Sequence, residues 1–137
     1  MSEKMLQKIG RLRETLELLR GLSSDCRDRI RSDALYRGAL LHYLYVLADG
    51  VVSLAEMLIG ERGLRPPQTY REAIVRLGEA GILEPAFASD FSRIAGFRNF
   101  VAHNYDTLDE EIVCGLLERL HEAEEFITAV ESALSAD

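Results

Sequence analysis

The residues best suited to chemistry lie in one short stretch, residues 97–105. Within it Asn99 and His103 are four positions apart, so an α-helix would place them on one face, one turn apart. Arg98 lies at the edge of that face, and Tyr105 follows the histidine at or just past the expected helix end. The spacing predicts that a guanidinium, an amide, an imidazole and a phenol converge.

This set of groups suits a phosphate. Arginine offers a planar fork of donors and keeps its charge, and histidine can move a proton near neutral pH. Asn99 could orient the imidazole or donate to an oxyanion. The stretch has no obvious cluster of metal ligands. We therefore expect metal-independent RNA cleavage without a cofactor, in which the ribose 2′-OH attacks the phosphate, His103 handles a proton and Arg98 stabilises the charge on phosphorus.

Two arginines interrupt otherwise apolar helix faces. Arg98 follows Ile94 where the pattern calls for an apolar side chain, and Arg37 stands in line with leucines of an earlier helix. Burying a charge there is costly unless it is paired. A structural role would pair each arginine with an acid such as Asp49 or Asp90, and we favour this role for Arg37. The neighbours of Arg98 favour a functional role, although the spacing alone is a weak signal.

The elements that must position these residues all have helical periodicity. The first segment places Met5, Ile9 and Leu12 on one stripe, which is typical of an amphipathic helix. No segment has the two-residue alternation of a strand. We predict an all-α, up-and-down bundle of about five helices. The expected helices cover about residues 2–22, 25–59, 69–78, 85–103 and 107 onward.

Local signals mark the helix boundaries. The stretch GERGLRPPQ, residues 60–68, ends the long second helix. Thr69 followed by Glu72 is a capping-box pattern that begins the third helix, and Thr107 followed by Glu110 repeats the pattern before the last helix.

Length and composition indicate one soluble globular domain over residues 1–137, because 47% of the residues are hydrophobic and 28% are charged. We expect a cytoplasmic protein without a membrane span, since the sequence has neither a charge-free window of sufficient length nor a secretory signal. The formal net charge of −7 argues against a general nucleic-acid binder. Any bound RNA must meet a local cluster of arginines or a surface assembled from two subunits.

Cys26 and Cys114 lie far apart and show no metal-ligand spacing. We therefore expect two ordinary thiols in a reducing compartment rather than a disulfide or a zinc site.

At the reactive stretch the sequence resembles the HepT-like toxins of the HEPN superfamily, whose signature is R-N-x3-H-x-Y. Arg98, Asn99, His103 and Tyr105 fill every position of it. The similarity extends over nearly the whole chain, including residues 33–37 with the apolar helix and Asp49 after them, residues 63–73, and residues 77–83.

The resemblance implies a helical homodimer whose two motifs face each other across a cleft, and an RNase that acts as the toxin of a toxin–antitoxin pair. It also implies a partner, a minimal nucleotidyltransferase antitoxin that transfers AMP from ATP to Tyr105. The added phosphates would fill the anion site beside Arg98 and block RNA. Two copies of Arg98, joined by Arg37 or Arg93, would give an acidic protein a positive cleft.

Two alternatives remain open. In one, the chain is a binding or regulatory partner of a nucleotidyltransferase, with Tyr105 as AMP acceptor and little RNase activity of its own. In the other, it is a scaffold bundle with a coincidental motif. We assign His121 to a solvated face, and His42, Tyr43 and Tyr45 to packing or an interface.

Overall fold

The computed structural model of the chain describes residues 3–103 and 109–136, with side chains for 3–99 and 109–136. These residues form helices, and no strand occurs within the described ranges. The helical class is therefore confirmed. The helices are α1 (Glu3–Gly21), α2 (Cys26–Ser32), α3 (Ala34–Arg62), α4 (Tyr70–Glu79), α5 (Pro85–Phe91), α6 (Ile94–His103), α7 (Glu110–Leu117) and α8 (Leu120–Ser135).

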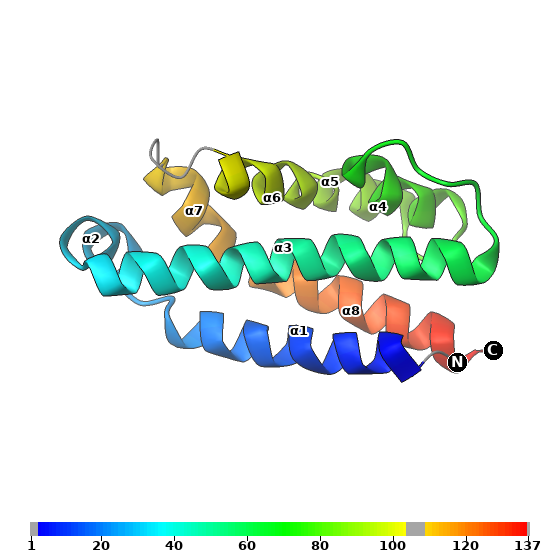
Figure 1. The fold of residues 1–137 in the computed structure, drawn as a ribbon, viewed down its shortest axis with the longest axis horizontal. Coiled ribbons are helices and arrows are strands. Elements are labelled where there is room, and N and C mark those ends of the chain that lie inside the picture. Colours follow the sequence, from blue (N-terminus) through cyan, green and yellow to red (C-terminus); the bar gives the residue numbers. More distant parts are fainter. Residues whose placement is uncertain (1–2, 104–108, 137) are drawn as a thin grey trace.

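The long helix α3 runs the length of the molecule and is its central element (Figure 1). It packs against α1, α2, α4 and α6. In Figure 1, α1 and α8 lie on one side of α3, and α4, α5 and α6 lie on the other. The two termini lie at one end of the molecule, and α2 and α7 lie at the opposite end.

The predicted stripe of α1 forms part of the core, since Met5, Ile9 and Leu12 are all buried. Gly50 of α3 lies directly against this stripe, and a Cβ atom there would come within 2.5 Å of Leu12 Cδ2. The absence of a side chain at position 50 therefore lets α1 approach α3 closely.

The expected number of about five helices is too low, because three of the expected helices are each divided in two. Asp33 has extended backbone angles (φ −127°, ψ 102°) and separates α2 from α3, where its side chain accepts a hydrogen bond from the Tyr36 N–H. A turn at Ser92 and Arg93 separates α5 from α6. Glu118 and Arg119 separate α7 from α8. Apolar periodicity continues across each of these turns, which is why the pattern did not reveal them.

The N-terminal half of the capping box predicted at Thr69 is present. Thr69 Oγ1 accepts a hydrogen bond from the Glu72 N–H at 3.0 Å and begins α4. Thr107 lies outside the described residues, but α7 begins at Glu110 with Asp109 as its N-cap, which accepts from the N–H groups of Glu111 and Ile112. An aspartate immediately before the first helical turn can reach these free donors directly.

The structure contradicts the prediction of two free thiols, because Cys26 and Cys114 form a disulfide. The two cysteines are 88 positions apart in the sequence, but the packing of α2 against α7 brings their Cα atoms to 5.8 Å. That separation lies within the range a disulfide can bridge. Arg27 pairs with Glu111 and Glu118 beside the disulfide, which joins the same two helices a second time.

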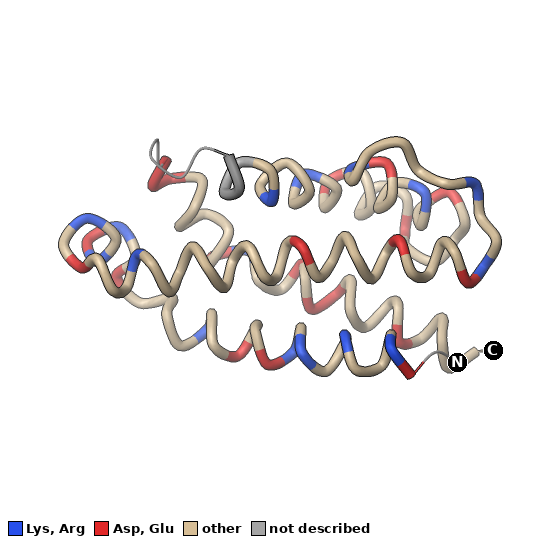
Figure 2. Tube along the Cα trace, in the orientation of Figure 1, with Lys and Arg blue, Asp and Glu red and all other residues tan. Residues whose placement is uncertain are grey.

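By length and composition alone, α3 could cross a membrane. Figure 2 shows that much of this helix is uncharged. A core helix passes the same test, and 56% of its most apolar window is buried inside the protein.

Candidate active site

Arg98 of α6 points toward α3 and has four partners there and nearby. Its Nε donates to Asp49 Oδ1 at 3.1 Å, and its Nη1 donates to Asn99 Oδ1 at 3.2 Å. The guanidinium carbon also lies 4.7 Å from the ring centre of Tyr70 and 5.7 Å from that of Tyr45. Both distances are within the range of a cation–π contact. The side chains of three helices therefore hold this guanidinium in place.

The environment of Arg98 favours its charged form. Burial lowers the pKa of the guanidinium, but the hydrogen bond to Asp49 and the nearby Tyr45 and Tyr70 oxygens together outweigh it, so the pKa lies above its ordinary value. The Arg98 side chain is 21% exposed and the Asp49 side chain 41%. Arg98 is thus a permanent positive charge that is held in one orientation and still reaches solvent.

The pairing with Asp49 shows that the structural and functional interpretations of Arg98 are compatible. A single carboxylate offsets the cost of placing the charge on an apolar face. In the described part of the chain, the second terminal nitrogen of Arg98 makes no hydrogen bond. No described residue therefore competes with an incoming oxyanion for that nitrogen.

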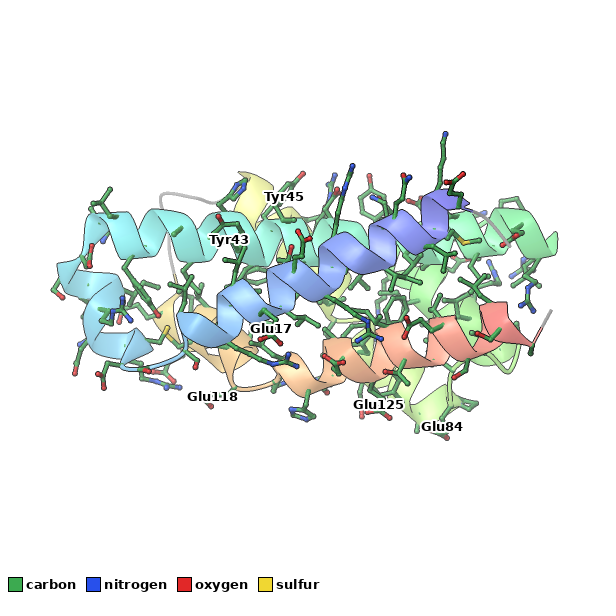
Figure 3. All side chains as sticks on the ribbon, turned by 90° about the horizontal axis from the view of Figure 1, so that it is seen from below. Glu17, Tyr43, Tyr45, Glu84, Glu118 and Glu125 are labelled. Carbon is green, nitrogen blue, oxygen red and sulfur yellow. A yellow bond between two sulfur atoms is a disulfide. The ribbon has the colours of Figure 1, made fainter. Side chains whose placement is uncertain are left out.

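Tyr45 and Tyr70 contact Arg98 although neither belongs to the predicted site, and Tyr45 was expected only in packing or an interface. Tyr45 lies four residues before Asp49 on α3, so the two side chains share a helix face, and this spacing could have identified it. Figure 3 shows Tyr43 and Tyr45 on different sides of α3. Tyr43 packs against the core, as expected, whereas Tyr45 contacts Arg98. No local signal links Tyr70 to Arg98, because the two meet only through the packing of α4 on α6.

The other half of the motif is not tested by these contacts. Helix α6 ends at His103, but the His103 side chain and the whole of Tyr105 lie outside the described residues. The convergence of all four motif side chains therefore stays a prediction. Arg98 and Asn99 are the part that the structure brings together.

The two further arginines lie in different places. Arg37 donates to the Ile30 carbonyl at 2.9 Å, so its partner is a backbone oxygen and not the expected acid. It lies twelve residues before Asp49, which is about 18 Å along a helix with a rise of 1.5 Å per residue. Within one chain Arg37 is therefore remote from Arg98. Arg93 is exposed at the start of α6 and lines the same hollow as Asn99.

Two hollows adjoin α6. One, of about 330 Å³, is mostly apolar and lies between α3, α6, α7 and α8, with Leu47, Phe97, Ile112 and Leu116 among its walls. The other is more polar and lies beside Arg98. Among the residues whose side chains are described, no group of three or more His, Cys, Asp or Glu could hold a metal ion. The prediction of metal independence needs an experiment.

Two solved structures share the helical fold of this chain. A tri-AMPylated HEPN toxin of Shewanella oneidensis, solved in complex with an MNT antitoxin, matches with a TM-score of 0.86 at 18% identity and covers 96% of this chain and 99% of its own. The cytosolic protein of unknown function YutE from Bacillus subtilis matches with a TM-score of 0.83 at 15% identity and covers 97% of this chain and 90% of its own. At these identities the matches establish the helical HEPN fold.

The family follows from the sequence comparison. The model of the family described as "Ribonuclease HepT-like" matches residues 5–130. The mRNA nuclease HepT of Shewanella oneidensis is 18% identical over 133 residues, which are 96% of this chain and 99% of the relative. The chain belongs to the HepT-like ribonuclease family.

Proposed function

We propose that this protein is the endoribonuclease toxin of a toxin–antitoxin pair and that it cleaves RNA without a metal. The observation that carries the proposal is the Arg98 cluster, in which a permanent positive charge is oriented by Asp49 and Asn99 within the family's motif. Oriented guanidinium donors are suited to the charge that develops on a phosphate oxygen during displacement. The name of the Shewanella oneidensis relative, an mRNA nuclease, supports RNA as the substrate.

In the proposed reaction, the ribose 2′-oxygen forms a bond to phosphorus as the bond from phosphorus to the 5′-oxygen breaks. The 2′-OH loses a proton and the leaving oxygen gains one. His103 is the group of the motif that can transfer a proton near neutral pH, while Arg98 stabilises the phosphoryl oxygens.

Cleavage of RNA by the purified chain in EDTA tests this activity. We expect the wild type to cleave, and we expect Arg98→Ala and His103→Ala to lose at least about 100-fold in kcat/KM, which is the usual cost of removing one such charge-stabilising or proton-transfer group. His121→Ala is the matched control, because His121 is exposed on α8 and should not change cleavage. An unmodified wild type that leaves RNA intact would support the alternative of a regulatory partner instead.

We also propose that a minimal nucleotidyltransferase antitoxin silences the toxin by attaching AMP to Tyr105. The AMPylated toxin in the Shewanella oneidensis complex supports this regulation. Co-expression with the nucleotidyltransferase should give AMP-sized mass increments that disappear in Tyr105→Phe and persist in Tyr43→Phe. Increments that persist in Tyr105→Phe would place the acceptor elsewhere.

A cytoplasmic homodimer completes the proposal. Two copies would place two Arg98 clusters near one RNA and so offset a chain charge of −7. The description of the related YutE as cytosolic supports the location. Light scattering coupled to size exclusion tests the stoichiometry, and a purely monomeric, active enzyme would contradict it.

A further inference from the structure

Beside Arg98 lies a hollow of about 330 Å³, between the start of α4 and the turn that joins α5 to α6. Tyr70 and Arg71 line it from α4, and Arg93 and Asn99 line it from the other side. Two of these residues also belong to the Arg98 cluster, since Asn99 accepts a hydrogen bond from Arg98 and the Tyr70 ring contacts the Arg98 guanidinium. The hollow is therefore continuous with the candidate active site.

Arg71 is held in position by a buried hydroxyl group. Its Nε donates to Ser92 Oγ at 3.1 Å, and Ser92 is 0% exposed. The hydroxyl of Ser92 in turn donates to the Ser89 carbonyl at 2.6 Å, so its own orientation is determined. Only one edge of the Arg71 guanidinium is used in this hydrogen bond, and Arg71 is otherwise exposed at the hollow.

Arg71 and Arg93 bring two positive charges to the hollow. Among the described residues, neither arginine has a carboxylate partner, although the chain is acidic overall. Most other arginines do have one. Carboxylate ion pairs are made by Arg13, Arg20, Arg27, Arg31, Arg76, Arg98 and Arg119. The two unpaired guanidinium groups thus make this hollow a local positive site.

We propose that the hollow is a second phosphate subsite, in which Arg71 and Arg93 bind the phosphate of the nucleotide next to the cleaved bond. Guanidinium groups match phosphate oxygens in charge and geometry. Gly96 in the wall has open space around its Cα, so the backbone leaves room for the ligand. This inference rests on the proposed RNase function and defines its substrate as an oligoribonucleotide with at least two consecutive phosphates.

Binding and cleavage together test the subsite. A 2′-deoxy oligonucleotide cannot be cleaved by 2′-OH attack, so its fluorescence anisotropy reports binding alone. We expect Arg71→Gln and Arg93→Gln each to raise its Kd about tenfold. The slope of log K against log salt should also decrease by about 0.7 for each phosphate of the single strand that the variant no longer neutralises. Arg11→Gln removes the same charge from an exposed position of α1 and should change neither quantity.

Comparing the cleavage of two substrates distinguishes an effect on the subsite from an effect on the reaction centre. The Gln variants should lower kcat/KM for an oligoribonucleotide by a larger factor than kcat/KM for a dinucleotide with a single phosphate. Arg93 makes no side-chain hydrogen bond in the described structure, so its substitution tests the subsite even where Arg71→Gln lowers the melting temperature. If Arg93→Gln binds and cleaves like Arg11→Gln, the subsite is wrong while the RNase function stands. If the wild type binds the oligonucleotide but cleaves no RNA, the RNase proposal is wrong and the binding result decides the subsite alone.

Discussion

The guanidinium of Arg98 contacts the carboxylate of Asp49 and the rings of Tyr45 and Tyr70. These contacts restrict the side chain to one orientation before any ligand is present. Such preorganisation matters for charge stabilisation, because a group that must reorient during the reaction loses part of its effect. Asp49 is therefore a positioning residue for Arg98.

We expect Asp49→Asn to reduce RNA cleavage more than it reduces stability. The pair is partly exposed, so its loss should cost no more than about 1 kcal/mol of unfolding free energy. A less well oriented Arg98 should lower kcat by about tenfold, which corresponds to about 1.4 kcal/mol of transition-state stabilisation. Glu56→Gln removes one negative charge from an exposed site seven residues further along α3. If Asp49→Asn cleaves RNA as well as the wild type does, Asp49 has no role in orienting Arg98. An equal loss of cleavage in Asp49→Asn and Glu56→Gln would indicate an effect of overall charge.

At the level of elements, α2 and α7 are joined by the Cys26–Cys114 disulfide and by the ion pairs of Arg27. Helix α7 begins at Glu110, shortly after the motif ends at Tyr105. The connection between α2 and α7 therefore fixes the position of the helix that follows the motif. A disulfide that closes a long segment stabilises mainly by restricting the unfolded chain.

Reduction of this disulfide should lower stability. For a separation of 88 residues the chain-entropy model gives up to about 4 to 5 kcal/mol. Urea unfolding with and without dithiothreitol measures the difference, and the double variant Cys26→Ala, Cys114→Ala should be insensitive to the reductant. Thiol labelling of the unfolded, non-reduced protein provides an independent check. Two labelled thiols per chain in protein purified without reductant would contradict the disulfide.

At the level of the whole molecule, ion pairs connect the two helices that begin and end the described structure. Glu124 of α8 accepts hydrogen bonds from Arg20 and Arg13 of α1. The hydrogen bond from Arg20, followed by that from Arg13, lowers the pKa of the Glu124 carboxyl below its ordinary value despite partial burial. A lowered pKa in the folded state means that this contribution is present above the ordinary value of 4.5 and is lost as the pH falls below it.

Glu124→Gln should therefore lower the unfolding free energy at pH 7 and have a smaller effect in acid. The effect should stay below about 1 kcal/mol, because the paired side chains are more than one third exposed. Urea denaturation between pH 7 and pH 3 of the wild type and the variant should give curves that converge below pH 4.5. Glu125→Gln is the control, since Glu125 is exposed and has no ion pair in the described structure. Curves that stay parallel to pH 3 would contradict the assignment.

Much of the fold could be predicted from sequence because its causes are local. The stripe of Met5, Ile9 and Leu12 follows from helical periodicity, and Thr69 with Glu72 follows from hydrogen bonding at a helix start. The position of Arg98 on an apolar face was also visible in the periodicity of its helix. These features depend on residues within one or two turns of each other.

The remaining features depend on contacts between distant segments, so only the tertiary structure decided them. Asp49 was one of two candidate partners for Arg98, and the packing of α3 on α6 selected it. Packing also brought Tyr70 to Arg98, and Cys26 to Cys114 across 88 residues. By itself the sequence determined the helical bundle and the residues of its reactive motif. The three-dimensional packing determined which groups hold Arg98, because distances between helices are not encoded in local periodicity.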